Sequence, residues 1–166
     1  LALRSGSRHA GVQFVEALNL GPPIRVIDGV GGSTQSATPV TIFTQNFEAK
    51  ELFQRGTGFK LRTYCDVTGT ANTKTIVVTL GGTTLLTATI AATTLEYNIE
   101  VEFMITTAAS SSKCFTRINQ NGVLPVYAAT VPTEDMTAAT TLTVTHQVTN
   151  VADLNRVLFT ELAILH

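Results

Sequence analysis

Apolar and polar residues alternate along much of this chain, and the alternation predicts β-strands. It is clearest over residues 97–105, where Tyr, Ile, Val, Phe and Ile alternate with Asn, Glu, Glu and Met. Side chains of a strand point alternately to its two faces, so one face of this segment is predicted to be core and the other solvated. Similar patterns predict strands over residues 41–47, 59–67, 114–120, 123–128, 141–148 and 156–165.

Residues 74–90 predict a β-hairpin coated with threonine. Two runs of Thr, Ile, Val, Leu and Ala flank Gly81-Gly82, and glycine readily adopts the positive φ of tight hairpin turns. With a three-residue loop over residues 81–83, Leu85 is expected on the outer face with the threonines. The expected core face comprises Ile76, Val78, Leu86, Ala88 and Ile90.

The strands follow one another at short intervals, and no long segment has helical periodicity. About eight strands with regular turns predict an all-β, antiparallel sandwich. We expect a jelly-roll domain over residues 40–166, because two four-stranded sheets fit this length. An immunoglobulin-like sandwich is the nearest alternative. Antibody-type domains have a core Trp and paired cysteines, and this chain has no Trp, although many such sandwiches lack both features.

Residues 1–39 predict an extended N-terminal arm. This segment is rich in Gly, Pro and Ser, and Gly21-Pro22-Pro23 forces an extended path because a residue before proline avoids the helical region. A short helical turn near residues 12–18 and a short strand over residues 24–27 are the regular elements expected there. Its apolar side chains favour packing on a neighbouring protein.

Charge and composition narrow the classes of function. Charged residues make up 14% of the 166 residues and hydrophobic ones 44%, while Thr accounts for about one residue in six. A net charge of −1 lacks the basic footprint of a nucleic-acid-binding protein. Few charges fit a subunit that hides much of its surface in an oligomer. The sequence shows neither a membrane-spanning apolar run nor a secretory signal pattern, so we expect no membrane partner and no export by that route.

The nucleophiles and bases do not form a recognisable catalytic pattern. Cys65 and Cys114 lie in predicted strands, where buried thiols are expected rather than a disulfide. His146 shares strand parity with apolar residues, which predicts a core or interface histidine. No Gly-x-Ser-x-Gly turn accompanies it. The sequence also lacks His-x-His, Cys-x-x-Cys and calcium-loop patterns, so no metal and no cofactor are expected, although a structural metal at an oligomer axis stays open.

Three further features have ordinary structural interpretations. Glu100 and Glu102 lie about 6.5–7 Å apart on one strand face, a spacing that glycosidase carboxylates also use. An alternating strand always places its polar residues together, so we interpret them as a solvated face. The glycine-rich residues 29–32 lack the helix and cation of a phosphate loop and predict a turn. Arg4 and Arg8 lack aromatic partners, which argues against nucleic-acid binding.

Several segments carry a family resemblance when read in order. They are Gly-Phe-Lys-Leu-Arg-Thr-Tyr at residues 58–64, Thr-Gly-Thr-Ala-Asn-Thr-Lys-Thr at 68–75, Leu-Gly-Gly-Thr-Thr-Leu-Leu at 80–86, the 97–105 strand, and Asp-Leu-Asn-Arg-Val-Leu at 153–158. Over residues 47–164 this order resembles jelly-roll virion proteins of tailed bacteriophages. Such modules occur as capsid decoration proteins, head fibres and tail-fibre tips, usually as trimers. The resemblance therefore implies a role on the virion surface, and residues 1–39 lie outside it.

We therefore expect a non-enzymatic homotrimeric decoration, or cement, protein that binds the major capsid protein on the head surface and is assembled in the host cytoplasm. The 156–165 segment is apolar on both faces, as expected of a strand that is either central in a sandwich or half-buried by a partner. The predicted trimer contacts are Val157, Phe159, Leu162 and Leu165, and the predicted capsid-docking residues are Arg4, Arg8, Phe14, Leu18, Ile24 and Arg25.

The main alternative is a receptor-binding fibre tip that recognises carbohydrate. Sugar sites combine an aromatic platform with amide and carboxylate groups, for which residues 119–121, Tyr127 and Glu134-Asp135 are the candidates. With 7% aromatic residues and no Trp, the chain has few aromatic side chains that could form such a platform. A secreted TNF-like or adhesin module is a third interpretation, which the missing export signal disfavours.

Overall fold

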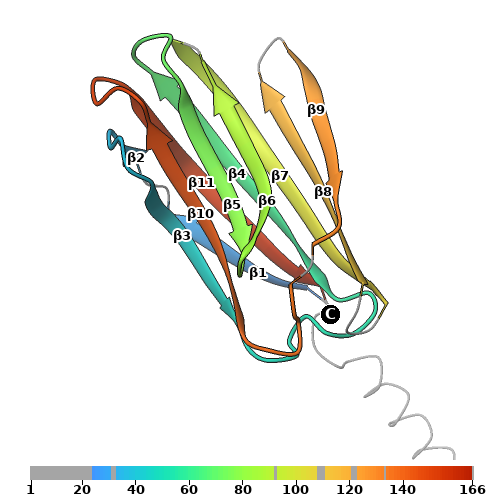
Figure 1. Cartoon of the computed structure of the whole chain (residues 1–166). Helices are drawn as coiled ribbons and strands as arrows, with labels where there is room; N and C mark the ends of the chain where they lie inside the picture. Colours follow the sequence, from blue (N-terminus) through green and yellow to red (C-terminus); the bar gives the residue numbers. More distant parts are fainter. Residues whose placement is uncertain are drawn as a thin grey trace, which may run out of the picture.

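The structure is a computed structural model that describes residues 24–30, 33–91, 93–107, 111–120, 123–132 and 134–165. Eleven strands form two sheets in these ranges, as Figure 1 shows. The larger sheet contains β1 (Ile24–Val30), β2 (Ser33–Thr34), β4 (Gly58–Thr68), β7 (Thr94–Thr107), β8 (Ser111–Gln120), β9 (Val123–Thr130) and β11 (Leu154–Leu165). The smaller sheet contains β3 (Val40–Phe47), β5 (Lys74–Leu80), β6 (Thr83–Ile90) and β10 (Thr140–Val148).

The chain passes repeatedly between the two sheets. The larger sheet has the order β1-β11-β4-β7-β8-β9, with β2 also pairing β11, and the smaller one has the order β3-β10-β5-β6. Every strand pair is antiparallel. In Figure 1 the smaller sheet lies in front of the larger one, and the β8–β9 hairpin stands beyond β6. The predicted all-β antiparallel sandwich is thus confirmed.

The core lies between the sheets and follows the predicted alternation. In β7 the residues Tyr97, Ile99, Val101, Phe103 and Ile105 are all buried, whereas the side chains between them are partly exposed. Near the end where β4 begins, Phe59 stacks between two other rings, with centroids 5.8 Å from Phe47 and 5.2 Å from Phe103. Stacked aromatic side chains bury a large apolar area, so this cluster fixes one end of the sandwich.

The β5–β6 hairpin has a tighter turn than the sequence predicts. Leu80 pairs with Thr83, so the loop holds two residues, Gly81 and Gly82, and Gly81 has φ +56°. A register shift follows between Val78 and Thr79. The five expected core residues of the hairpin are buried, but Leu85 is buried as well, because the shift turns it inward.

Part of the predicted arm belongs to the larger sheet. Strand β1 pairs with β11 over seven positions, from Ile24 opposite Leu165 to Val30 opposite Phe159, and β2 pairs with β11 at Asn155 and Arg156. The boundary predicted at residue 39 therefore falls after two strands of the sheet. Residues 1–23, with the helical turn expected near residues 12–18, lie outside the described residues.

A buried ion pair anchors the 68–74 turn to the segment before β11. Lys74 Nζ lies 3.4 Å from Asp153 Oδ2, and both side chains are fully buried. Asp153 Oδ1 accepts hydrogen bonds from Thr70 N at 2.6 Å and Thr70 Oγ1 at 2.8 Å, and these bonds, the backbone one above all, lower the pKa of Asp153. Gly69 has φ +125°, and a Cβ there would lie 2.3 Å from Asp153 Oδ1. The Asp153 carboxylate thus explains both residues of this turn. It leaves no room for a Cβ at Gly69, and it binds the hydroxyl of Thr70 across 83 residues of sequence.

Candidate functional site: the outer face of the larger sheet

Charged side chains form one row across the outer face of the larger sheet. The register places Arg117 of β8, Glu100 of β7, Arg62 of β4 and Glu161 of β11 at successive opposed positions. Glu100 Oε1 lies 2.6 Å from Arg117 Nη2 and 3.6 Å from Arg62 Nε. Alternating charge across neighbouring strands stabilises this register.

Glu100 and Glu102, which strand geometry predicts to lie about 6.5–7 Å apart, each form an ion pair. Glu102 is opposite Lys60, with Oε2 3.8 Å from Nζ. On its other side Glu102 is opposite Phe115, whose ring is 55% exposed beside a depression of about 250 Å³. Glu100 and Glu102 are partly exposed, which confirms the predicted solvated face of this strand.

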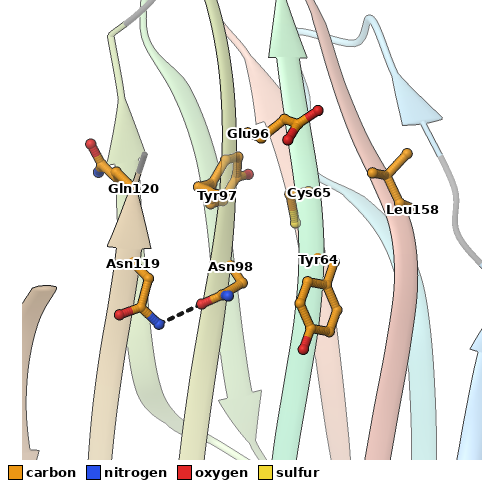
Figure 2. Close-up of a pocket in the computed structure, with 8 residues that line it drawn as sticks. All are labelled: Tyr64, Cys65, Glu96, Tyr97, Asn98, Asn119, Gln120 and Leu158. Atoms are coloured by element: carbon orange, nitrogen blue, oxygen red, sulfur yellow. Dashed lines mark hydrogen bonds between the residues drawn. The ribbon is translucent and has the colours of Figure 1, made fainter. Parts of the chain in front are cut away.

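The next row along the same face carries no charge, and we call it the neutral row. It consists of Asn119 of β8, Asn98 of β7, Tyr64 of β4 and Phe159 of β11 at opposed positions. Asn119 Nδ2 donates to Asn98 Oδ1 at 2.5 Å, and the ring centroids of Tyr64 and Phe159 lie 6.3 Å apart. Figure 2 shows Tyr64, Asn98 and Asn119 side by side on three strands. Three residues of the row, Tyr64, Asn98 and Asn119, line a shallow depression of about 370 Å³, together with Glu96, Gln120 and Leu158.

A β-bulge brings two neighbouring apolar side chains to this face. Val157 is opposite Cys65 and Phe159 is opposite Tyr64, so Leu158 is an extra residue in β11. Leu158 is 50% exposed and Phe159 is 38% exposed, although a regular strand would direct neighbours to opposite faces.

The bulge also divides the predicted trimer contacts between two faces. Val157 and Leu162 are buried in the core of their own sandwich, so their prediction as contact residues is wrong. Phe159 is exposed, and Leu165 is partly exposed next to Gly58 and Ile24. Of the predicted contact residues, only Phe159 and Leu165 thus have side-chain surface open to solvent, and the neighbouring Leu158 is exposed as well.

A further charged row lies on the far side of the neutral row. Glu96 of β7 is opposite Asp66 of β4, which is opposite Arg156 of β11. Arg156 donates to both oxygens of Asp66, through Nε at 2.9 Å and through Nη2. This fork geometry satisfies the guanidinium and raises the pKa of Arg156. The depression therefore lies between two groups of paired charges.

The polar groups beneath the depression are buried and neutral. Tyr97 Oη donates to Asn155 Oδ1 at 3.0 Å, and Cys65 contacts Tyr97. Burial raises the pKa of the Cys65 thiol to about 12 and that of Tyr97 well above its usual range. Cys65 and Cys114 are both buried and unbridged, as predicted, and a thiol with this pKa is a poor nucleophile.

His146 lies in the core, as its strand parity predicts. Its side chain is 1% exposed on β10, and burial lowers its pKa to about 4. Neither ring nitrogen has a partner at full hydrogen-bond geometry, although the backbone of Asn155 opposes the pKa shift in part. The imidazole is therefore neutral at pH 7 and shielded from solvent.

The described residues include only part of the predicted docking arm. Arg4, Arg8, Phe14 and Leu18 lie outside the described residues. Ile24 and Arg25 lie in β1, where their backbones pair with Leu165 and Ile164, and their side chains are not described.

The carbohydrate candidates from the sequence do not form one described site. Asn119 belongs to the neutral row and Gln120 lines the same depression, whereas Asn121 and the side chain of Tyr127 lie outside the described part of the chain. Glu134 Oε2 accepts from Gly82 N at 3.1 Å and so caps the β5–β6 turn. Asp135 accepts from Thr137 Oγ1 at 2.6 Å and from Thr137 N, which lowers the pKa of Asp135. These two carboxylates thus have structural partners.

The sequence pattern does not mark Tyr64, Glu96 or Asn98 as functional residues. The alternation of β7 does place Glu96 and Asn98 on the outer face. What the sequence lacks is the pairing of β4 with β7 and β8, which sets Tyr64 opposite Asn98 and Asn98 opposite Asn119.

The described residues contain neither a metal-binding group nor a membrane-spanning helix. No group of three or more His, Cys, Asp or Glu side chains is arranged there to hold a metal ion. Within the same ranges, no helix has the length and apolar character needed to cross a bilayer.

Comparisons with known proteins give only distant structural likenesses. No protein-family model and no curated protein matches the chain. Among solved structures, the VP2 subviral particle of infectious bursal disease virus is similar over 86% of this chain, with 14% identity and a TM-score of 0.40. Dimeric latent PorU from Porphyromonas gingivalis is similar over 85%, with 9% identity and a TM-score of 0.42. The chain spans 33% of the VP2 chain and 12% of the PorU chain, and scores this low carry no argument about function.

Proposed function

We propose that this chain is a non-enzymatic structural protein of a virion, and specifically a trimeric decoration protein on the head of a tailed bacteriophage. The observation that carries the proposal is the strand order, taken together with the sequence resemblance to jelly-roll virion proteins. The structural comparisons are too distant to add weight.

The strand pairing supports a jelly roll. The pairs β1–β11, β3–β10, β4–β7 and β5–β6 are nested, with the earliest strand beside the latest and the middle strands joined by a hairpin. A single long hairpin rolled into two four-stranded sheets has this nesting, which is how we interpret the fold. The β8–β9 hairpin lies outside the nesting and extends the larger sheet.

The outer side of β11 is the proposed trimer contact. Leu158, Phe159 and Leu165 lie there, and β1 continues the same sheet beyond β11. Apolar side chains exposed on a sheet face favour association with another subunit. Residues 1–23 would then reach the major capsid protein from the β1 edge.

The protein would act by shifting the equilibrium between assembled and disassembled shells. A protein that binds only the assembled shell stabilises that shell by mass action, because the bound state is removed from the disassembly equilibrium. This mechanism needs complementary surfaces and no reacting group, in keeping with the buried thiol of Cys65 and the buried imidazole of His146.

Two truncations test the docking role. A chain lacking residues 1–23 keeps β1 on β11, whereas a chain lacking residues 1–39 exposes the edge of β11. We expect the first to fold, judged by circular dichroism, and to lose binding to undecorated phage heads in a co-sedimentation assay. The second is expected to lose stability as well. Full binding by the chain lacking residues 1–23 would show that the arm does not dock.

A further inference from the structure

We propose that the depression along the neutral row binds a neutral saccharide, with a pyranose ring against Tyr64. This site shares Asn119 and Gln120 with the carbohydrate candidates of the sequence and differs from them in its other residues, and it does not depend on a virion role. Its volume of about 370 Å³ is at the lower end of the range of small-ligand pockets, roughly 300–1,000 Å³. The argument rests on three kinds of group that line it.

Tyr64 supplies an apolar platform. Its side chain is 40% exposed, and its ring packs against Phe159 at a centroid distance of 6.3 Å and an interplanar angle of 36°. One neighbour thus supports the ring while part of it faces solvent. Aromatic rings that are apolar in the body and polar at the tip suit ligands of mixed character, such as a sugar ring with one C–H face.

The amides of Asn98 and Asn119 supply a paired donor and acceptor. Their mutual hydrogen bond uses Asn119 Nδ2 and Asn98 Oδ1, so it directs both amide groups. Asn98 Nδ2 remains as a donor and Asn119 Oδ1 as an acceptor on adjacent strands. Each sugar hydroxyl both donates and accepts, and a vicinal pair of hydroxyls matches this arrangement.

The surrounding charges favour a neutral ligand over an acidic one. Glu96 lines the depression and can accept a hydroxyl proton in a hydrogen bond. On the same side, Arg156 is paired with Asp66, and on the other side Arg62 and Arg117 share Glu100. An anionic sugar would therefore meet a carboxylate and would have to compete for cations that already hold one.

A glycan array probed with the labelled full chain tests the proposal. The array should carry neutral hexose and N-acetylhexosamine oligosaccharides and their sialylated counterparts. We expect binding to neutral oligosaccharides, and calorimetry with the best of them should show binding roughly tenfold or more weaker for Tyr64→Ala and for Asn98→Ala. The matched control is Phe115→Ala, which removes an exposed ring from the same face outside the depression and should leave affinity unchanged.

Several outcomes would overturn the site. These are no binding on the array, binding confined to sialylated glycans, or equal losses in Tyr64→Ala and Phe115→Ala. Sedimentation velocity adds a separate check, because the site borders the proposed trimer surface: Leu158 lines the depression and Tyr64 contacts Phe159. A change of subunit number in Tyr64→Ala, with no change in glycan affinity, would assign Tyr64 to subunit contact instead.

Discussion

Lys74 and Asp153 form an ion pair with no exposure to solvent, their charged atoms 3.4 Å apart across 79 residues of sequence. Lys74 Nζ also donates to the carbonyl oxygen of Thr70 and, at 3.0 Å, to that of Asn72. These contacts satisfy a buried ammonium that would otherwise be costly. The pair therefore joins the 68–74 turn, which carries part of the family resemblance, to the entry of the last strand.

Replacing Lys74 with methionine should destabilise the fold strongly. The variant leaves the Asp153 carboxylate buried without its cation, and breaking a buried pair in this way typically costs about 3–5 kcal/mol. Urea unfolding followed by circular dichroism measures the change. Lys60→Met is the matched control, because Lys60 and Glu102 form an exposed pair at 3.8 Å, worth about 0–1 kcal/mol. Equal losses in the two variants would contradict the structural role of the buried pair.

The two glycines of the β5–β6 turn should differ in their tolerance of alanine. Gly81 has φ +56°, and a Cβ there would lie 1.9 Å from Glu134 Oε1, whereas a Cβ at Gly82 meets nothing within 4 Å. We expect Gly81→Ala to lower the free energy of unfolding by about 1–2 kcal/mol and Gly82→Ala to change it little. Thermal unfolding of both variants decides the point, and the opposite order would show that the turn is wrongly assigned.

Stability should fall between pH 6.5 and pH 4 because of His146. Its pKa is about 4 in the folded chain and about 6.5 when unfolded, so the unfolded chain binds more protons in this window. The contribution is complete above pH 6.5 and is lost as the pH falls towards 4, a change of about 3 kcal/mol at most. Asp153 affects stability only below this window. Its pKa is lowered from 3.8 in the folded chain, so its contribution to the free energy of unfolding is present above pH 3.8 and is lost as the pH falls further.

The pH effect can be isolated with one variant. His146→Leu removes the titrating group and keeps an apolar side chain in the core, so its urea midpoint should depend much less on pH between 4 and 6.5. If the wild-type chain and His146→Leu lose stability in parallel over that range, another group is responsible.

The sequence predicts where the strands of this fold lie better than it predicts which strands pair. Alternation assigned the core face of residues 97–105 correctly, because burial on one side repeats every second residue along a strand. It could not place Leu85 or Leu158, since a β-bulge changes which face a residue takes and leaves no periodic trace. The pairing of β1 with β11 joins residues at opposite ends of the sequence, so β1 was assigned to the arm.

The sequence predicts only part of the candidate site. Asn119 was proposed for carbohydrate binding because of its residue type, and Asn98 was assigned to the outer face. The neutral row requires a correct register across β8, β7, β4 and β11, which no local pattern encodes. For the same reason Glu134 was expected to bind ligand, although it caps a turn from a different hairpin.

A cryo-electron-microscopy map of a particle that contains this chain tests the proposed decoration role most directly. We expect density for a two-sheet sandwich on the outer surface of the head, in groups of three, with β11 towards the centre of each group. Density for the chain at the tail tip, or a head surface without it, would contradict the role as a decoration protein.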